Sequence, residues 1–334
     1  MPLPVGKLPS AMLERLLTLC RPDPRVLIGP RVGQDAAALA FGDQVVVAKT
    51  DPITFATDRI GWYAVNVNAN DVACAGAVPR FFLATVLLPE AKATEEMAET
   101  IFRDIATSCE ALDITLCGGH TEITYGLDRP IVVGQMLGDV ARERLVSNNR
   151  SQVGDTVILT KGIAIEGTSL IAREKGDELA DIVDAALLER TRGFLDAPGI
   201  SVVPDAAVVC SVAHPHALHD PTEGGLATGL HELADAAGLG VAVDADGIAV
   251  LPETAALCDH CGLDPLGLIA SGALLAVVAP ADAGSVLDAL AASGIAAAPI
   301  GHMVERNEGV TIQRGAARAA LPRFDSDEVT RLFT

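Results

Sequence analysis

The sequence predicts an α+β protein built of two domains, and three observations lead to that expectation. The chain has 334 residues, more than one compact core usually holds, and 50% of them are apolar, which is enough to fill two cores. Helical and strand-like apolar patterns alternate along both halves. Turn-forming residues from Ser147 to Gly154 interrupt these patterns near the middle. We therefore expect one domain over residues 1–150 and a second over residues 151–334.

The first half is a β-rich mixture of the two patterns. Apolar residues at helical spacing predict helices, and short apolar or alternating runs predict strands. The expected helices are Ala11–Cys20, Ile60–Ala75 and Glu95–Ala111, and the expected strands are Val45–Thr50, Phe81–Leu88, Ile114–Cys117 and Ile131–Val140. The helix that begins at Ile60 also carries Asn68, Asn70 and Asp71. Because polar groups are costly to bury unpaired, this set favours contact with a metal or nucleotide over a dry core.

The second half predicts a further sheet with helices between its strands. The expected strands are Thr156–Thr160, Leu274–Val278 and Ala297–Ile300, and the expected helices are Glu178–Arg192, Glu223–Ala237 and Ala281–Ala292. Lys161 and Gly162 open a strand-to-helix turn, whose amides suit a phosphate at the helix N-terminus. The spacing of this turn is not that of a Walker A loop.

Composition excludes several classes of partner. A formal charge of -20, with no local cluster of Lys and Arg, repels nucleic acid and anionic membranes. No apolar run approaches the roughly 20 residues of a membrane span, and Met1–Ser10 lacks an export signal, so we expect a cytoplasmic protein. The 7 cysteines lie mostly in apolar stretches and read as reduced thiols. Cys258 and Cys261 form a lone CxxC without the second pair of a zinc site.

Four acidic turns are the most informative motifs in the chain. They are Gly33–Ala36, Thr50–Pro52, Asn68–Asp71 and Asp220–Gly225. Each sets a carboxylate beside small, turn-forming residues at the edge of an apolar run. Magnesium takes only one or two protein carboxylates at a time and shares its other positions with water and substrate phosphates, so scattered single Asp residues suit it. The alternative for each turn is a purely structural role as a turn or helix cap.

The order of these turns resembles the AIR synthetase superfamily of ATP-dependent enzymes. That group includes aminoimidazole ribonucleotide synthetase, selenophosphate synthetase, thiamine-monophosphate kinase and HypE. The resemblance is closest to the HypE-like, AIR-synthase-related branch. The motifs that carry it, in the family's order, are Val32–Ala37, Thr50–Phe55, Val67–Asp71, Gly118–Glu122, Asp220–Leu226 and Gly262–Leu266.

The resemblance implies a fold, an assembly and two cofactors. The N-terminal domain is expected to form a β-barrel across a homodimer, with nucleotide in a cleft beside that interface, and the C-terminal domain an α/β sandwich. ATP and Mg²⁺ are the implied cofactors. The implied metal ligands are Asp35, Asp51 and Asp71, and the implied nucleotide contacts are Asn68, Gly118 and Gly119. Lys161 and Gly162, in the strand-to-helix turn described above, are further candidate nucleotide contacts.

Three further residues are candidates for the chemistry. His120 departs from the acidic residue that many members of the superfamily carry after the paired glycines. A neutral imidazole is a poor magnesium ligand, so His120 either bonds phosphate, acts as an acid or base, or makes a structural hydrogen bond. Glu122 is a possible replacement carboxylate, and Asp220 either faces the substrate or caps a helix. The histidines at positions 214, 216 and 219 invite a zinc interpretation, although Pro215 favours a loop.

The reaction implied by the resemblance is phosphoryl transfer from ATP to an amide, carbonyl or phosphate oxygen, catalysed mainly by positioning and charge neutralisation. HypE dehydrates a thiocarboxamide on a cysteine within its own terminal Pro-Arg-Ile-Cys. This chain instead has Pro322-Arg323-Phe324-Asp325, and its last cysteine is Cys261. We therefore expect a separate small-molecule acceptor or a thiol on another protein, such as a metallocofactor maturation protein. The alternatives are a small-molecule kinase resembling thiamine-monophosphate kinase, and a nucleotide-binding maturation partner without turnover.

Overall fold

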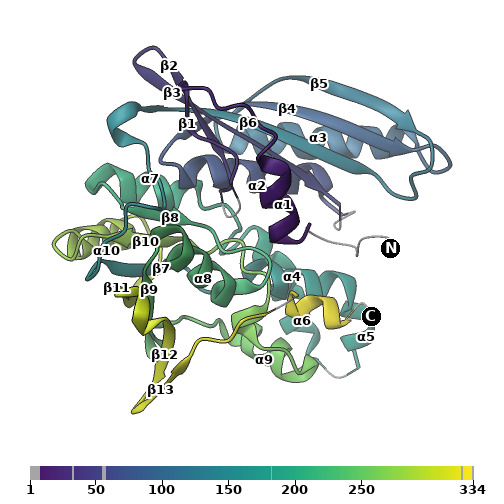
Figure 1. Ribbon diagram of the computed structural model, residues 1–334. Coiled ribbons are helices and arrows are strands. Elements are labelled where there is room, and N and C mark those ends of the chain that lie inside the picture. Colours follow the sequence, from purple (N-terminus) through teal and green to yellow (C-terminus); the bar gives the residue numbers. More distant parts are fainter. Residues whose placement is uncertain (1–7, 32–33, 55–57, 182, 325, 333–334) are drawn as a thin grey trace. The chain divides into compact units, whose positions relative to one another are not determined.

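The computed structural model describes residues 8–31, 34–54, 58–181, 183–324 and 326–332 (Figure 1). The chain divides into two compact units, Met1–Leu145 and Val146–Thr334. In the described residues, no helix combines the length and apolar character that a membrane crossing requires. The predicted motif residues Val32, Gly33, Phe55 and Asp325 lie outside the described residues.

Unit 1 is built on a six-stranded sheet with the order β1-β2-β3-β6-β4-β5. Its strands are β1 (Val26–Ile28), β2 (Ala37–Phe41), β3 (Gln44–Ile53), β4 (Val78–Pro89), β5 (Thr115–Thr124) and β6 (Ile131–Ala141). Neighbouring strands are antiparallel except β4 and β5, which are parallel because helix α3 connects them. The sheet is open within this single chain, so the barrel across a dimer remains a prediction.

The helices of unit 1 are α1 (Ser10–Leu17), α2 (Ile60–Cys74) and α3 (Glu95–Ala111). Helix α2 is almost wholly buried and packs against β3, β6 and α3. Gly134 and Gly138 let it lie close to the sheet, since a Cβ at either position would collide with Asn68 or Val72 of α2. This close packing places the polar residues of α2 directly against the central strands.

Unit 2 contains a seven-stranded, mostly antiparallel sheet with the order β13-β12-β9-β11-β7-β10-β8. Its strands are β7 (Thr156–Thr160), β8 (Ala217–His219), β9 (Gly240–Asp244), β10 (Leu275–Val278), β11 (Ala297–Val304), β12 (Val310–Arg314) and β13 (Ala317–Ala320). Its α-helices are α4 (Ile165–Glu174), α5 (Gly176–Leu179), α6 (Ala185–Arg192), α7 (Val203–Val212), α8 (Gly225–Ala237), α9 (Pro252–Cys261) and α10 (Ala283–Ala292).

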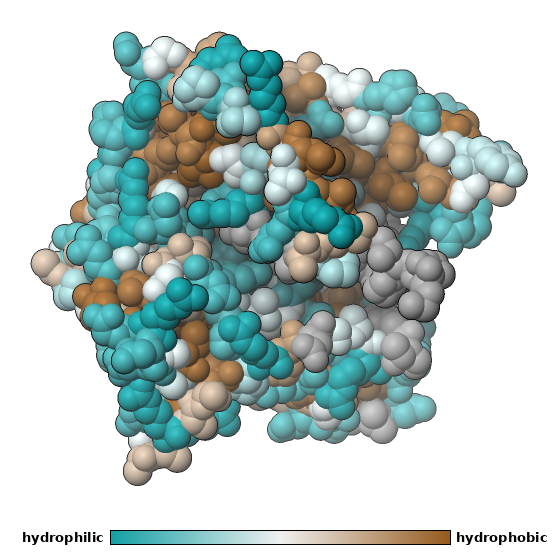
Figure 2. All heavy atoms as spheres, in the orientation of Figure 1, coloured by the Kyte–Doolittle hydropathy of each residue, from teal (hydrophilic) through white to brown (hydrophobic). Residues whose placement is uncertain are grey.

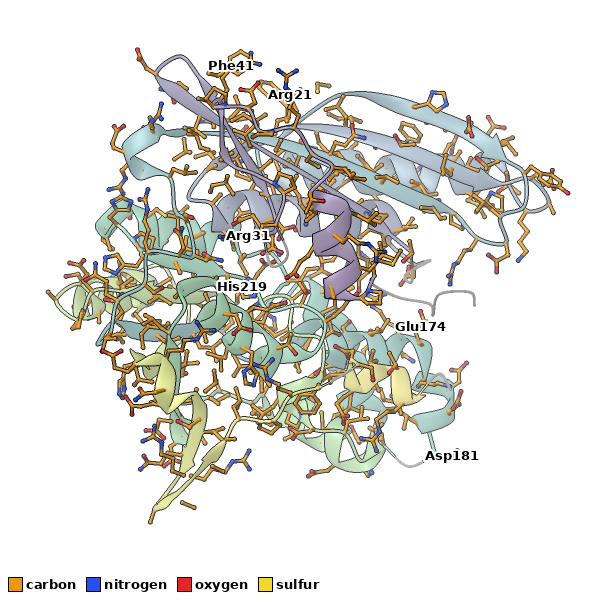
Figure 3. All side chains as sticks on the ribbon, in the orientation of Figure 1. Arg21, Arg31, Phe41, Glu174, Asp181 and His219 are labelled. Atoms are coloured by element: carbon orange, nitrogen blue, oxygen red, sulfur yellow. The ribbon has the colours of Figure 1, made fainter. Side chains whose placement is uncertain are left out.

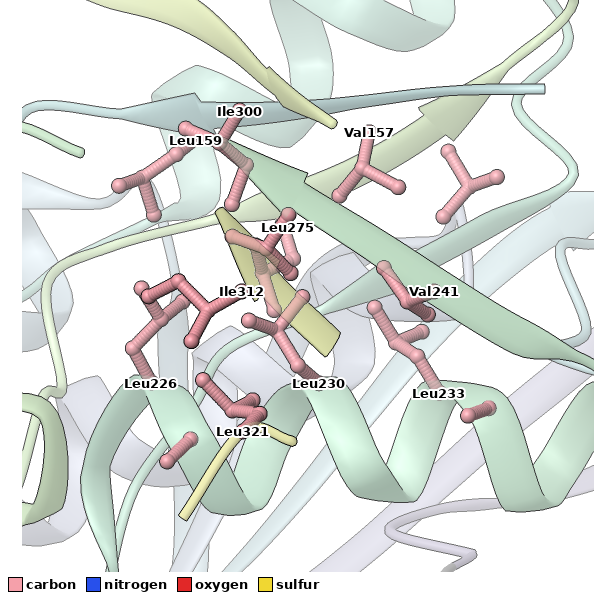
Figure 4. Close-up of a cluster of buried hydrophobic side chains, with 14 of the residues drawn as sticks. Val157, Leu159, Leu226, Leu230, Leu233, Val241, Leu275, Ile300, Ile312 and Leu321 are labelled. Atoms are coloured by element: carbon pink, nitrogen blue, oxygen red, sulfur yellow. The ribbon is translucent and has the colours of Figure 1, made fainter. Parts of the chain in front are cut away.

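One core of unit 2 lies between α8 and the sheet (Figure 4). Leu226, Leu230 and Leu233 follow the helical spacing of a single face of α8, and they meet alternate residues of the strands, such as Val157 and Leu275. A second cluster joins α4, α5, α6 and α9.

The predicted α+β class is confirmed, and several element predictions are wrong in their bounds. The expected helix Glu178–Arg192 is two helices, α5 and α6, because Asp184 caps the second by accepting a hydrogen bond from the Leu187 amide at 3.0 Å. The expected strand Ile114–Cys117 continues to Thr124, since pairing with β4 extends through the paired glycines.

Candidate functional site

The centre of the candidate site in unit 1 is a lysine between two of the predicted metal ligands. Lys49 and Asp51 point to the same face of β3, and α2 presents Asp71 to that face. The Lys49 Nζ lies 2.7 Å from Asp71 Oδ2 and 3.2 Å from Asp51 Oδ2. Lys49 and Asp71 are largely buried, whereas 38% of the Asp51 side chain is exposed. The site therefore has a buried floor and one side open to solvent.

The charge of Asp35, the third predicted metal ligand, also acts on Lys49. Burial alone would lower the pKa of Lys49, but the charges of Asp71, Asp51 and Asp35 outweigh burial and raise the pKa well above its usual value. Three carboxylates thus act on one ammonium group. The sequence analysis missed Lys49, and the signal that identifies it is its position two residues before Asp51 on a strand, which puts both side chains on one face.

Asn68 links α2 to β3 beside this cluster. Its Nδ2 donates to the Ala64 carbonyl at 2.8 Å and to the Asp51 carbonyl at 3.4 Å. Its Oδ1 is buried and accepts no hydrogen bond within the described part of the chain. A buried acceptor without a partner is destabilising, so this oxygen is suited to a water molecule or ligand that the site takes up.

The donor set fits magnesium rather than a softer metal. Asp51, Asp71 and Asn68 offer only oxygen atoms, which Mg²⁺ prefers, and Mg²⁺ needs few of them because phosphates and water complete its shell. In the described residues, no group of three or more His, Cys, Asp or Glu side chains is arranged to hold a single ion. Asp51 and Asp71 meet at Lys49, and Asp35 acts on Lys49 through its charge.

His120 and Glu122 lie on the other face of the sheet. His120 pairs with Thr85 of β4, and Thr85 pairs with Val133 of β6, so all three side chains point to one face. The residue after Val133, Gly134, points to the opposite face, where α2 packs. The His120 Nε2 lies 3.2 Å from Glu122 Oε2, and both side chains are exposed. This hydrogen bond, followed by one from Thr124, lowers the pKa of Glu122. Within one subunit the structure therefore does not bring the two predicted catalytic residues to Asp51 and Asp71.

Gly118 and Gly119 lie on β5, where it pairs closely with β4. Gly119 has φ +154°, and a Cβ there would collide with the carbonyl of Ala84 on β4, so the close strand pairing requires glycine. Gly118 is in ordinary contact with Leu83. Asp51 of β3 pairs with Gly134 of β6, Gly134 with Ala84 of β4, and Ala84 with Gly119 of β5. Asp51 and Gly119 are therefore three strand spacings, roughly 14 Å, apart.

Lys161 and Gly162 have their hydrogen-bond partners within unit 2. The Lys161 Nζ donates to the Ser201 carbonyl at 2.7 Å and lies 3.3 Å from Asp205 Oδ2, with both side chains buried. Burial lowers the pKa of Lys161, although Asp205 opposes that shift. The amides of Lys161, Gly162 and Ile163 all donate to carbonyls. These three amides are therefore already satisfied within unit 2, and a phosphate at this turn stays a prediction.

Asp220 lies buried in the turn that leads into α8, near three other acidic residues. Burial raises the pKa of Glu166 to about 7; a hydrogen bond with Ser271 opposes this shift, and the charges of Asp327, Glu223 and Asp220 add to it. The sequence analysis did not identify Glu166 as a site residue, although its position in the first turn of α4, just after the glycine-containing turn, was visible in the sequence.

Asp327 fixes the turn before α8. Its Oδ2 accepts a hydrogen bond from the Gly224 amide at 2.7 Å, and its Oδ1 accepts one from the Val329 amide at 2.9 Å. Gly224 and Gly225 have φ values of +77° and +64°, which favour glycine. Asp327 therefore holds the turn that runs from Asp220, directly after β8, to the start of α8 at Gly225.

The nearby histidines pair with carboxylates. His216 Nδ1 lies 2.6 Å from Asp155 Oδ2, and His219 Nε2, labelled in Figure 3, lies 2.9 Å from Glu232 Oε2. The described residues contain no group that would hold zinc here.

Comparison with known proteins places these two units in one family. Residues 33–140 match the family model of the AIR synthase related protein, N-terminal domain, and residues 152–313 match the corresponding C-terminal domain. A carbamoyl dehydratase HypE from Rhizobium leguminosarum bv. viciae is 31% identical over 285 residues, which are 82% of this chain and 78% of the relative. The chain belongs to the AIR synthase-related family.

Other relatives extend the likeness over nearly the full chain. A hydrogenase expression/formation protein of Methanocaldococcus jannaschii is 27% identical over 314 residues, 91% of this AIR synthase-related chain and 90% of the relative. Among solved structures, HypE in complex with ATP has a TM-score of 0.73 at 22% identity and covers 95% of this chain and 91% of its own.

Two further structures share the fold. The HypE-HypF complex has a TM-score of 0.73 at 21% identity, covering 86% of this AIR synthase-related chain and 93% of its own. AaThiL complexed with AMPPCP and TMP has a TM-score of 0.71 at 16% identity, with 92% and 93% covered.

Proposed function

We propose that this protein is an ATP- and Mg²⁺-dependent enzyme that phosphorylates an amide or carbonyl-type oxygen of an acceptor, as a HypE-like dehydratase. The observation that carries the proposal is the Lys49 cluster, in which the predicted ligands Asp51 and Asp71 share one ammonium and Asp35 adds its charge. Relatives named carbamoyl dehydratase HypE support the reaction class. A HypE structure with the same fold, in complex with ATP, supports the nucleotide.

The residues of the cluster divide the work of holding a nucleotide. Asp51 and Asp71 would hold Mg²⁺, and the buried Asn68 Oδ1 would accept a hydrogen bond from a water molecule or ligand in the site. Bound Mg²⁺ supplies the positive charge that neutralises the transferring phosphate. The buried floor of the site limits the water that competes for the phosphoryl group, while the exposed side of Asp51 admits the nucleotide.

The acceptor is a separate molecule or a thiol on a partner protein. Phe324 packs onto the core of unit 2, where its ring lies against Gly267. The next residue along the chain is Asp325, at the position where the HypE resemblance has the carrier cysteine. A carboxylate does not carry a thiocarboxamide. The HypE-HypF complex supports a maturation protein as the partner that delivers the acceptor.

The test is ADP release in the presence of a peptide that carries an S-carbamoylated cysteine. We expect the peptide to raise ADP release several-fold and to lose one water as its thiocarboxamide becomes a thiocyanate, which mass spectrometry detects. Phosphorylation of thiamine monophosphate in the same assay would favour the kinase alternative instead. ATP binding without stimulation by the peptide, by a purified maturation partner or by thiamine monophosphate would indicate a nucleotide-binding partner.

We further propose a homodimer formed through the outer face of the sheet in unit 1. Helices α2 and α3 pack on the opposite face. The outer face carries alternate apolar residues that are half-buried or exposed, namely Val46, Phe81, Leu83, Leu87, Val133 and Leu137. Hydrophobic side chains gather over this region (Figure 2), and Phe41 projects from the end of β2 (Figure 3). An apolar sheet face of this kind is typical of an interface.

Replacing Phe81, which is 49% exposed, with glutamate is expected to convert the dimer to a monomer, because each subunit would bury an unpaired charge in the proposed interface. Sedimentation equilibrium measures the mass. Phe102, which is 41% exposed on α3, provides the matched control, since Phe102→Glu changes the helix side and leaves the dimer intact. A wild-type monomer at micromolar concentration would contradict the proposed assembly.

A further inference from the structure

Lys49 contacts both of the proposed metal ligands, Asp51 and Asp71. Its Nζ bonds Asp71 Oδ2 at 2.7 Å and Asp51 Oδ2 at 3.2 Å, so one ammonium bridges an element of the sheet and the buried helix α2. Only 12% of the Lys49 side chain is exposed. The ammonium therefore sits on the same carboxylate oxygens that a divalent cation requires.

A metal ion on these oxygens conflicts with the ammonium. Mg²⁺ binds carboxylate oxygen at about 2.0–2.1 Å, so an ion on Asp71 Oδ2 and Asp51 Oδ2 would lie within a few ångströms of the Lys49 Nζ. Two cations at that distance repel strongly where solvent screening is weak. Both therefore fit only if the ammonium moves or gains a new anionic partner, and the phosphates of a nucleotide are such a partner.

We propose that Lys49 is an internal cation that competes with Mg²⁺ for Asp51 and Asp71, and that nucleotide phosphate relieves this competition by taking up the ammonium. The inference rests on the proposed function and adds its regulation: metal and nucleotide bind together, and metal alone binds weakly. In the absence of both, Lys49 keeps the carboxylates from repelling one another and holds β3 to α2.

The experiment uses Mn²⁺, which shares the oxygen preference of Mg²⁺ and reports its binding by electron paramagnetic resonance. Mn²⁺ is titrated into the nucleotide-free wild type, Lys49→Met and Lys49→Arg at constant ionic strength. Lys49→Met is expected to bind Mn²⁺ at least about tenfold more tightly than the wild type, because the competing charge is gone. Lys49→Arg, which keeps the charge, is expected to bind as weakly as the wild type. Lys92→Met controls for loss of an exposed lysine of unit 1.

A stability measurement covers the case in which Lys49→Met folds poorly. Without metal, Asp51 and Asp71 repel each other in this variant, so its melting temperature falls. Added MgCl₂ is expected to raise that temperature much more than it raises the wild-type value. Lys49→Gln, which is smaller and also uncharged, is expected to behave in the same way.

Two results would overturn the inference: Mn²⁺ binding to Lys49→Met that equals or falls below the wild-type value, or equal effects of MgCl₂ on the stability of both proteins. Calorimetry of Mg²⁺–ATP binding to the wild type separates this failure from failure of the proposed function. If the wild type binds Mg²⁺–ATP and the Lys49 variants show no gain for free metal, the nucleotide site stands and the role of Lys49 is wrong. If the wild type does not bind Mg²⁺–ATP, the proposed function itself fails.

Discussion

Replacing Lys161 with methionine is expected to lower the free energy of unfolding of unit 2 by about 3–5 kcal/mol. The substitution leaves the carboxylate of Asp205 buried without its ammonium, and it removes the hydrogen bond to the Ser201 carbonyl. Asp205 Oδ1 already accepts no hydrogen bond among the residues described, so the carboxylate has little to replace Lys161. Chemical denaturation followed by circular dichroism measures the loss.

The double variant Lys161→Met with Asp205→Leu is the matched control. Because it removes both charges, it is expected to be more stable than Lys161→Met alone. ATP affinity is expected to stay near the wild-type value in both proteins, since the ammonium is engaged within unit 2. Wild-type stability combined with lost ATP affinity in Lys161→Met would restore Lys161 as the nucleotide contact that the sequence predicts.

Replacing Glu166 with glutamine is expected to remove a large pH dependence of stability. The pKa of Glu166 rises from its usual 4.5 to about 7, mainly through burial, so the native protein keeps this proton after the unfolded chain has released it. The stability that the protonated group contributes is complete below pH 4.5 and is lost as the pH rises through about 7. From pH 4.5 to about 7, the free energy of unfolding of the wild type is expected to fall by about 3 kcal/mol more than that of Glu166→Gln.

Denaturation curves at several pH values between 4.5 and 7.5 compare the two proteins. Glu174→Gln, an exposed position on the same helix, is the control and is expected to follow the wild type at every pH. Parallel curves for the wild type and Glu166→Gln would mean that Glu166 ionises normally in the folded protein.

Much of the fold follows from local pattern. The helix Glu95–Ala111 matches its prediction at both ends because Thr94 caps it, accepting a hydrogen bond from the Met97 amide at 3.1 Å, and its apolar spacing is regular. Strand β7 also matches, since it is a short buried apolar run. Strands such as β2, β9 and β13 were not predicted, because they take their structure from pairing with neighbouring strands.

The site was predictable in its residue types and only partly in its geometry. Asp51, on a strand, and Asp71, in the polar cluster of a buried helix, are brought together at Lys49. The lysine between them was missed, although its place two residues before Asp51 on one strand puts both side chains on one face; its contact with Asp71 depends on how α2 packs against β3. His120 and Glu122 were grouped with the Asp residues because of motif order alone. Their position on the opposite face of the sheet depends on the register of three strand pairings, which the sequence does not show.

The most direct test of the proposed function is ATP binding by calorimetry, with and without Mg²⁺, in the wild type and in Asp71→Asn. Glu99→Gln, which removes an exposed carboxylate on helix α3 of the same unit, is the control. We expect Mg²⁺-dependent binding in the wild type and the control. In Asp71→Asn we expect it to weaken by about a hundredfold or more, since loss of even an outer partner of a metal ligand costs roughly 10–100-fold. Equal binding in all three proteins, or none in the wild type, would contradict a magnesium and nucleotide site at Asp71.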